Sequence, residues 1–261
     1  MRVITLGEIL LRFSTSEEIR IKNTDEFRVC YGGAETNVGI SLSQFGHKVS
    51  VASVLPESNP LSKAVLSRMH GYDVDTDLII EQPGRLGTYY LEQGNSFRGS
   101  QVTYDRKYSS IAMLEELCWD LDEIFKGVDL LHISGIVPAL SKKWQTWTVE
   151  IVKKAKEYGC LVSFDMNYRS KLWEYEEAYP CFQQIFPYVD ILSAGRLDAI
   201  HFLQVASAEE KVSLEEIYRR VKEKYANIKV LYSTKRNVIS TNHHELQGFY
   251  VGEDNNFVES K

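Results

Sequence analysis

The sequence lacks the features that mark several classes of protein. It has no long apolar run. The apolar stretch within residues 1–8 is short and is followed by a charged residue, so it is predicted to form a first strand and not a signal peptide or membrane segment. The net charge of −6, without a block of basic residues, argues against general nucleic-acid binding. The four cysteines, Cys30, Cys118, Cys160 and Cys181, have no metal-ligand spacing. We therefore expect free thiols in a cytoplasmic protein.

With 261 residues, 44% of them hydrophobic, the chain can bury a sizeable core. It contains no internal repeat and no low-complexity segment. Its character changes near residue 110. Before that point, short segments with polar flanks and intervening turn residues are typical of strands in an antiparallel sheet. These segments are 9–13, 27–31, 88–92 and 102–104.

After residue 110, strand and helix patterns alternate, which predicts right-handed crossovers and a mostly parallel sheet. The predicted strands are 130–134, 160–165, 189–193 and 229–233. One helix is expected to begin at Ser141 and end at Gly159, and its predicted inward residues are Trp144, Thr148, Ile151, Val152 and Ala155. Ser213 and Glu216 form a predicted capping box for a second helix, on which Leu214, Ile217, Val221 and Tyr225 share one face.

The paired glycines Gly32 and Gly33 precede another predicted helix, which ends at Gly46 and repeats apolar residues at Val38, Leu42 and Phe45. Without side chains, the backbone at the pair can approach a polar ligand, and Asn37 offers an amide one turn later. Most Gly-Gly pairs are only tight turns. The combination with a following helix nevertheless indicates a small-molecule site.

Ligands of parallel sheets collect at the carboxyl ends of the strands, and two polar clusters follow predicted strands. Asp165, Asn167 and Arg169 leave one strand, and Tyr104 and Arg106 end another. A guanidinium at such a place can hold a planar carboxylate by two parallel hydrogen bonds. The alternatives are a solvated loop for the first cluster and a surface ion pair for the second.

Five segments taken together resemble the ribokinase-like (pfkB) carbohydrate kinases, and most closely the 2-keto-3-deoxygluconate kinases within them. The segments are 32–37, 85–89, 104–106, 132–136 and 165–173. The resemblance implies an α/β fold, a ribokinase-like three-layer sandwich with a mostly parallel sheet and a small antiparallel β lid. It further implies one domain over 1–261, with lid segments at 9–31 and 85–105 and the C-terminal part of the domain missing.

Carried over by position, the resemblance implies that the sugar acid is held by Gly33, Tyr89, Tyr104, Arg106 and Arg169, supported by Asn37 and Asp165. Two arginines suit a substrate with a carboxylate and would be surplus for a neutral hexose. The implied cofactors are ATP and Mg²⁺, with ATP near Ser193, Asp198 and Thr234 and the metal ligands unassigned. Lid strands with exposed edges can also pair with a second subunit.

The sequence departs from the family pattern after residue 193. Residues 195–198 keep only the last acid of an Asn-Glu-x-Glu run that is tied to magnesium and phosphate. Residues 233–237 contain no glycine where the family has a nucleotide-binding turn. No residue matches the Gly-Ala-Gly-Asp motif that supplies the catalytic base, which we expect beyond Lys261. We therefore assign no catalytic residue within 1–261 and expect this polypeptide alone to be inactive.

These patterns support three functions. The first is an ATP-dependent kinase that phosphorylates the primary hydroxyl of 2-keto-3-deoxygluconate. The second is a fructokinase or related ketose kinase of the same family, and the third is a noncatalytic sugar-acid-binding or regulatory protein. His132 lies in an apolar strand and is expected to be a hydrogen-bonded core residue. The pair at 243–244 lacks partners at metal-ligand spacing.

Overall fold

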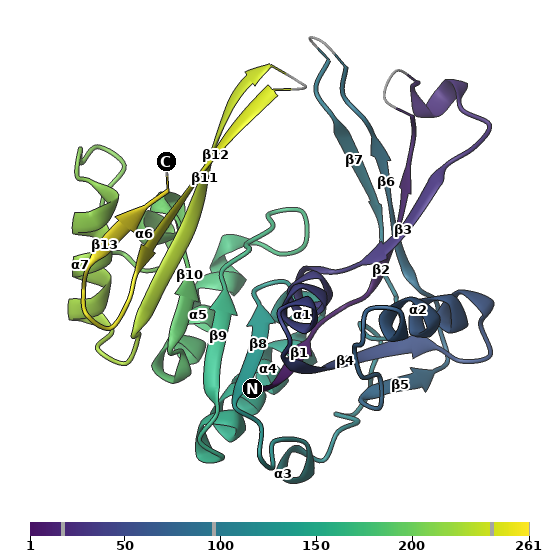
Figure 1. Ribbon diagram of the computed structural model, residues 1–261, viewed down its shortest axis with the longest axis horizontal. Helices are drawn as coiled ribbons and strands as arrows, with labels where there is room; N and C mark the ends of the chain where they lie inside the picture. Colours follow the sequence, from purple (N-terminus) through teal and green to yellow (C-terminus); the bar gives the residue numbers. More distant parts are fainter. Residues whose placement is uncertain (17–18, 96–97, 241–242, 261) are drawn as a thin grey trace. The chain divides into compact units, whose positions relative to one another are not determined.

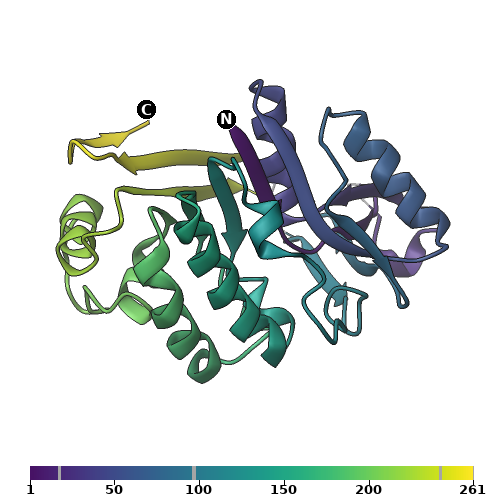
Figure 2. The same cartoon turned by 90° about the horizontal axis from the view of Figure 1, so that it is seen from below.

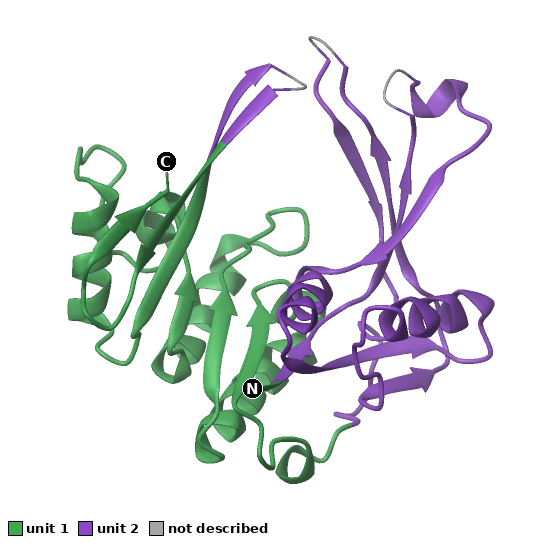
Figure 3. Ribbon diagram, viewed as in Figure 1, with its two compact units in different colours: residues 1–2, 119–235, 246–261 green, residues 3–118, 236–245 purple. Residues whose placement is uncertain are grey.

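The computed structural model describes residues 1–16, 19–95, 98–240 and 243–260 (Figure 1). Two compact units make up the chain (Figure 3). Unit 1 comprises residues 1–2, 119–235 and 246–261, and unit 2 comprises residues 3–118 and 236–245. The change of sequence character near residue 110 thus lies close to a boundary between the units, and the prediction of one domain over 1–261 stays a prediction.

Unit 1 contains a sheet with the strand order β13-β12-β11-β10-β9-β8. The strands β8 to β11 are parallel to one another, and β12 and β13 are antiparallel, so the predicted parallel-rich sheet is present. Their bounds are β8 (Leu130–Ser134), β9 (Leu161–Asp165), β10 (Ile191–Ser193), β11 (Val230–Ser240), β12 (His243–Val251) and β13 (Phe257–Glu259). The strand predicted over 229–233 continues to Ser240, because no glycine or proline interrupts it.

The helices of unit 1 lie on one face of its strands (Figure 2). They are α3 (Leu121–Ile124), α4 (Lys142–Glu157), α5 (Tyr175–Ile185), α6 (Arg196–His201) and α7 (Leu214–Lys224), with short 3-10 turns at Pro138–Leu140 and Phe186–Tyr188. The prediction for α4 is confirmed. The hydroxyl of Ser141 accepts a hydrogen bond from the backbone N–H of Trp144, Gly159 has a φ of +78°, and all five predicted inward residues are buried.

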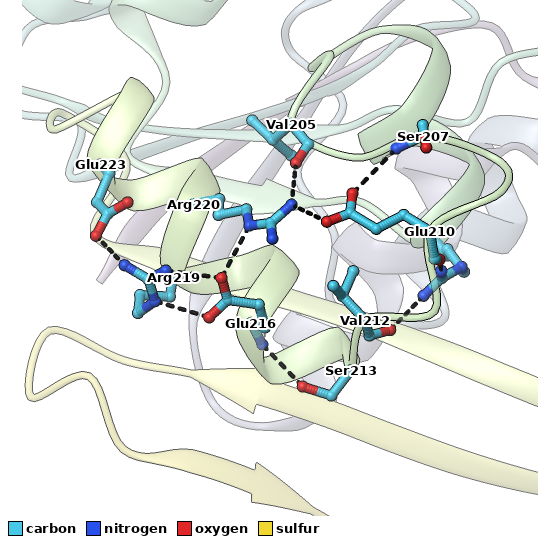
Figure 4. A network of polar contacts seen from close by, with 10 residues as sticks. Val205, Ser207, Glu210, Val212, Ser213, Glu216, Arg219, Arg220 and Glu223 are labelled. Atoms are coloured by element: carbon cyan, nitrogen blue, oxygen red, sulfur yellow. Dashed lines mark hydrogen bonds and ion pairs between the residues drawn. The ribbon is translucent and has the colours of Figure 1, made fainter.

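Helix α7 begins with half of the predicted capping box. The hydroxyl of Ser213 accepts a 3.1 Å hydrogen bond from the backbone N–H of Glu216. The carboxylate of Glu216 instead binds the guanidinium groups of Arg219 and Arg220 (Figure 4). These bonds lower the pKa of Glu216 to about 2. A cation one turn along the helix is thus the partner of this carboxylate, as at other i,i+3 and i,i+4 pairs.

Large aromatic side chains fill the core of unit 1. Phe182 of α5 lies 5.6 Å from Phe164, 5.3 Å from Trp173 and 5.1 Å from Phe202 between ring centroids, with near-perpendicular rings. Edge-to-face packing of this kind adds to the burial of apolar area. His132 of β8 is also buried, and its Nδ1 lies 3.0 Å from the hydroxyl of Ser163. The expectation of a hydrogen-bonded core histidine is confirmed.

Unit 2 contains the strand order β1-β4-β5, with β4 and β5 parallel. The elements are β1 (Arg2–Leu6), α1 (Ala34–Gln44), β4 (Lys48–Pro56), α2 (Pro60–His70) and β5 (Ile79–Gln82). Helix α1 ends as predicted at Gly46, whose φ is +84°. Its predicted apolar face is wrong, since Phe45 is 80% exposed and the buried residues are Glu35, Thr36 and Gly39. A Cβ atom on Gly39 would lie 2.9 Å from the hydroxyl of Thr5, so the lack of a side chain at Gly39 allows this face of α1 to pack closely against β1.

The second sheet of unit 2 has the order β3-β2-β6-β7 and corresponds to the predicted lid. Its strands are β2 (Leu10–Ser14), β3 (Arg28–Gly32), β6 (Gly87–Glu92) and β7 (Gln101–Asp105), with a 3-10 turn at Ile21–Asn23 before β3. The outer pairs are antiparallel, whereas the central pair of β2 and β6 is parallel, because a long connection separates these strands in sequence. The predicted pairing with a second subunit would use an edge strand, β3 or β7.

In the described residues, no helix is both long and apolar enough to cross a membrane. All four cysteines are free thiols, as expected.

Candidate functional site

The paired glycines lie where the lid strand β3 ends and helix α1 begins. Gly33 is the N-cap of α1, and a Cβ atom on it would lie 2.2 Å from the backbone carbonyl oxygen of Glu8. A Cβ atom on Gly32 would lie 2.6 Å from Oδ1 of Asn37. Asn37 is exposed, and its backbone N–H donates to the carbonyl of Gly33. Close packing at this corner therefore requires glycine at both positions, and the Asn37 side chain lies against Gly32. Contact of this corner with a ligand stays a prediction.

A row of four polar side chains crosses the lid sheet in register. Cys30 of β3 pairs with Arg12 of β2, Arg12 pairs with Tyr89 of β6, and Tyr89 pairs with Tyr104 of β7. The tyrosine rings lie 5.9 Å apart between centroids. A hydrogen bond with Cys30 is the main cause that raises the pKa of Arg12. Sequence analysis missed Arg12, although alternation along β2 places it on the same face as the predicted tyrosines.

Arg106 follows β7 directly and is bound to Glu8, which lies between β1 and β2. Nε of Arg106 donates a 2.8 Å hydrogen bond to Oε2 of Glu8, and Nη2 donates to the same oxygen. Both residues are buried, at 8% and 3% exposure. Sequence analysis missed Glu8, because nothing local links two positions that are 98 residues apart. The second arginine of this region, Arg85, forms an exposed pair of 2.6 Å with Asp105.

In unit 1, the ends of β9 and β10 and the third residue of β11 bring polar side chains into register. Asp165 at the end of β9 pairs with Ser193 at the end of β10, and Ser193 pairs with Tyr232 of β11. Burial raises the pKa of Asp165, and hydrogen bonds from Ser193 and from the backbone of Asn167 oppose this effect. The positive charge of the exposed Arg169 also lowers the pKa of Asp165. The predicted cluster at this strand exit is therefore a partly buried, hydrogen-bonded group.

Two of the residues expected near ATP, Asp198 and Thr234, lie in a helix and in a strand and not in the turns of the family pattern. Asp198 lies in the first turn of α6, and its Oδ2 accepts a 2.8 Å hydrogen bond from the backbone N–H of Gly195. Burial raises the pKa of Asp198, and the charge of Asp165 adds to this. Thr234 is exposed within the continuous strand β11, where the family pattern would place a turn.

A magnesium ion needs oxygen ligands, usually carboxylates together with substrate phosphates. Among the residues that the structure describes, no three His, Cys, Asp or Glu side chains are grouped to hold a metal ion. Asp165 and Asp198 are the two partly buried carboxylates of the unit 1 cluster, and burial raises the pKa of both. These residues do not form a magnesium site by themselves, and we derive no step through the metal.

The predicted site residues fall into two groups. Unit 2 contains Gly33, Asn37, Tyr89, Tyr104 and Arg106, and unit 1 contains Asp165, Arg169, Ser193, Asp198 and Thr234. A separate groove of about 600 Å³ in unit 1 lies between α7 and the segment that leads into β13. It is lined by Glu216, Arg219, Lys222 and Phe257, among others, and by none of the predicted residues.

Three known proteins show what this chain is similar to. A 2-dehydro-3-deoxygalactonokinase of Haloferax volcanii is 35% identical over 198 residues, which are 75% of this chain and 61% of that protein. Two crystal structures, each with a TM-score of 0.94, match 100% of this chain and 79% of their own. They are a PfkB family carbohydrate kinase of Listeria grayi, 42% identical, and a 2-dehydro-3-deoxygluconokinase of Thermotoga maritima, 36% identical.

The chain thus spans about three fifths of the curated relative and about four fifths of the two solved chains. The structural matches confirm the predicted ribokinase-like fold. The model of the pfkB family carbohydrate kinases matches residues 2–247, which is most of the chain. This chain therefore belongs to the pfkB family of carbohydrate kinases.

Proposed function

We propose that this chain binds a 2-keto-3-deoxy sugar acid, such as 2-keto-3-deoxygluconate, and that the whole protein phosphorylates its primary hydroxyl with ATP. The observation that carries the proposal is the buried guanidinium of Arg106 beside the corner at Gly33 and the tyrosines of β6 and β7. A fixed guanidinium favours a ligand with a carboxylate. The names of the relatives from Haloferax volcanii and Thermotoga maritima support a substrate of this class.

Each predicted residue has a role in this proposal. Arg106 and Arg169 bind the carboxylate, and the backbone at Gly33 lies against the sugar. Tyr89 and Tyr104 offer ring faces and hydroxyl groups to the carbon chain, since an amphipathic ring suits a hydroxylated ligand. The supporting residues are Asn37 and Asp165.

The proposed reaction is the transfer of the γ-phosphoryl group of ATP to the substrate. The hydroxyl oxygen forms a bond to the γ-phosphorus, the bond between that phosphorus and the bridging oxygen of ADP breaks, and the hydroxyl proton leaves to a base. Ser193, Asp198 and Thr234 remain the residues proposed to lie near ATP. The base is not assigned, because no residue of this sequence matches the family motif for it.

A noncatalytic sugar-acid-binding protein is the second candidate, and two observations favour it. The carboxylate of Asp198 is engaged by the backbone of Gly195, and β11 runs through the place of the nucleotide turn. A protein of this kind would keep the binding of the sugar acid and lack the transfer step.

Calorimetric titration with 2-keto-3-deoxygluconate, its galacto epimer and D-fructose tests the binding. We expect a sugar acid to bind at least tenfold more tightly than fructose, because fructose has no carboxylate for the arginines. Tighter binding of fructose would favour the ketose kinase, and binding of neither class would overturn the proposal. Release of ADP after addition of ATP and Mg²⁺ then separates a kinase from a noncatalytic binder.

A further inference from the structure

Glu8 of unit 2 constrains the side chain of Arg106 through two hydrogen bonds. Its Oε2 accepts from both Nε and Nη2 of the arginine, so the guanidinium plane is held along one edge. Glu8 is 3% exposed, and its Oε1 is buried without a hydrogen-bond partner among the described residues. A bond from two nitrogens to one oxygen fixes the direction of the guanidinium better than a single contact would.

The backbone around the pair is shaped to enclose it. A Cβ atom on Gly87 would lie 2.6 Å from Oε1 of Glu8 and 3.2 Å from Cβ of Arg106. The carbonyl oxygen of Glu8 in turn lies against Gly33. Glycine inside a strand weakens it and usually marks a close approach of another group. The groups that approach Gly87 most closely are the Glu8 carboxylate and the side chain of Leu10.

The energetics of buried charges favour a role in recognition. A buried ion pair contributes little net stability compared with packed apolar side chains, whereas removal of one partner leaves an uncompensated charge. We infer that Glu8 is a positioning residue, which fixes the guanidinium of Arg106 so that its other edge meets the carboxylate of the substrate. This inference rests on the proposed function for the identity of the ligand, and on the ion pair alone for the fixed guanidinium.

The bonds to Glu8 also determine which nitrogen of Arg106 faces a ligand. The hydrogen bonds of the Arg106 side chain use Nε and Nη2, which leaves Nη1 as the nitrogen that would meet a ligand. Tyr104, two residues before Arg106, is 40% exposed and lies opposite Tyr89 on the lid. The substrate carboxylate would thus approach from the edge of the guanidinium that Glu8 does not cover.

The test compares Glu8→Gln with the wild type, using 2-keto-3-deoxygluconate and 3-deoxyfructose, in which a hydroxymethyl group replaces the carboxylate. Glu8→Gln keeps the shape and loses the charge that fixes Arg106. We expect binding of the acid to weaken at least tenfold and binding of the neutral sugar to change less than twofold. Glu8→Asp, which restores the charge at a shorter reach, should recover part of the affinity for the acid.

The matched control is Glu92→Gln in β6 of the same sheet, because Glu92 forms an ion pair with Arg98, its side chain is 12% exposed, and it is not one of the proposed site residues. This variant should bind both sugars as the wild type does. Equal weakening of both sugars in Glu8→Gln would indicate a structural role and would overturn the inference.

A measurement without ligand separates this inference from the proposed function. In ¹⁵N NMR spectra, the Nε–H signal of Arg106, identified by its loss in Arg106→Lys, should exchange slowly with water in the wild type and faster in Glu8→Gln. Fast exchange in the wild type would overturn the inference whether or not a sugar binds. If the wild type binds no sugar acid, the proposed function fails, and a protected Nε–H still supports a guanidinium fixed by Glu8.

Discussion

The carboxylate of Asp198 accepts a 2.8 Å hydrogen bond from the backbone N–H of Gly195 and so caps the helix α6 in which it lies. Backbone N–H groups at a helix start have no partner within the helix, and a carboxylate in the first turn also interacts favourably with the helix dipole. The acid that the family pattern ties to phosphate and magnesium therefore has a structural bond in this chain.

We predict that Asp198→Ala lowers the free energy of unfolding by about 1 kcal/mol, because the N–H of Gly195 loses its partner. Asp198→Asn keeps an acceptor oxygen and should lose less. Urea denaturation of the two variants and the wild type provides the measurement. Equal stability of Asp198→Ala and the wild type would contradict the capping role.

The two proposed carboxylate-binding arginines should both matter for affinity. Arg106→Ala and Arg169→Ala are each expected to weaken binding of 2-keto-3-deoxygluconate by about 2–5 kcal/mol, because each removes one partner of a charge-assisted pair. Calorimetric titration measures the effect, and Arg68→Ala on α2, also an exposed arginine, is the control for Arg169. Unchanged affinity in both variants would refute the proposed role.

Gly33→Ala should disturb the corner between β3 and α1. The added Cβ would lie 2.2 Å from the carbonyl oxygen of Glu8, so backbone must shift, and overpacking of this kind costs about 1–3 kcal/mol of stability. Gly99→Ala is the matched control, because its Cβ would have no heavy atom within 4 Å. Thermal unfolding of both variants tests this, and a Gly33→Ala protein as stable as the control would show that the corner can relax.

The buried His132 predicts a pH dependence of stability. Burial lowers its pKa from 6.5 to about 4 in the folded protein. Between these values the unfolded chain binds a proton that the folded chain does not, so stability falls as the pH falls from 6.5 to about 4. This single group accounts for about 3 kcal/mol of that loss.

His132→Gln carries no titrating group, and its stability should change less over the same pH window. Urea denaturation at pH 7, 6, 5 and 4 measures the slope for both proteins. Parallel slopes for the variant and the wild type would mean that the pKa of His132 is the same in the folded and unfolded chains, which would contradict the prediction.

Local sequence signals predicted much of the fold. The caps at Ser141 and Ser213, the left-handed glycines at positions 46 and 159, and the strand patterns all depend on residues close together in the chain. The positions of Gly33 and Asn37 at a helix start are of the same kind. Such signals work because hydrogen bonds at helix ends and turns connect near neighbours.

Packing decided what those signals could not. The apolar spacing of α1 suggested a face with Phe45, but the close approach of Gly39 to Thr5 selected another. The carboxylate of Glu216 binds Arg219 and Arg220 on the helix surface, so only the hydroxyl of Ser213 caps the helix. For α1 the deciding contact joins residues far apart in the chain, whereas Glu216 and its two arginines are near neighbours on one helix.

By itself, the sequence determined the class of the fold, the family and the candidates for the sugar-acid site, because these depend on motifs and on the order of strands and helices. Only the tertiary structure decided that Arg106 is held by Glu8 and that Arg12 shares a row with Tyr89 and Cys30. The physical reason is that charges and strands far apart in the chain find each other through sheet register and burial. No local pattern records the partner that a buried arginine must have.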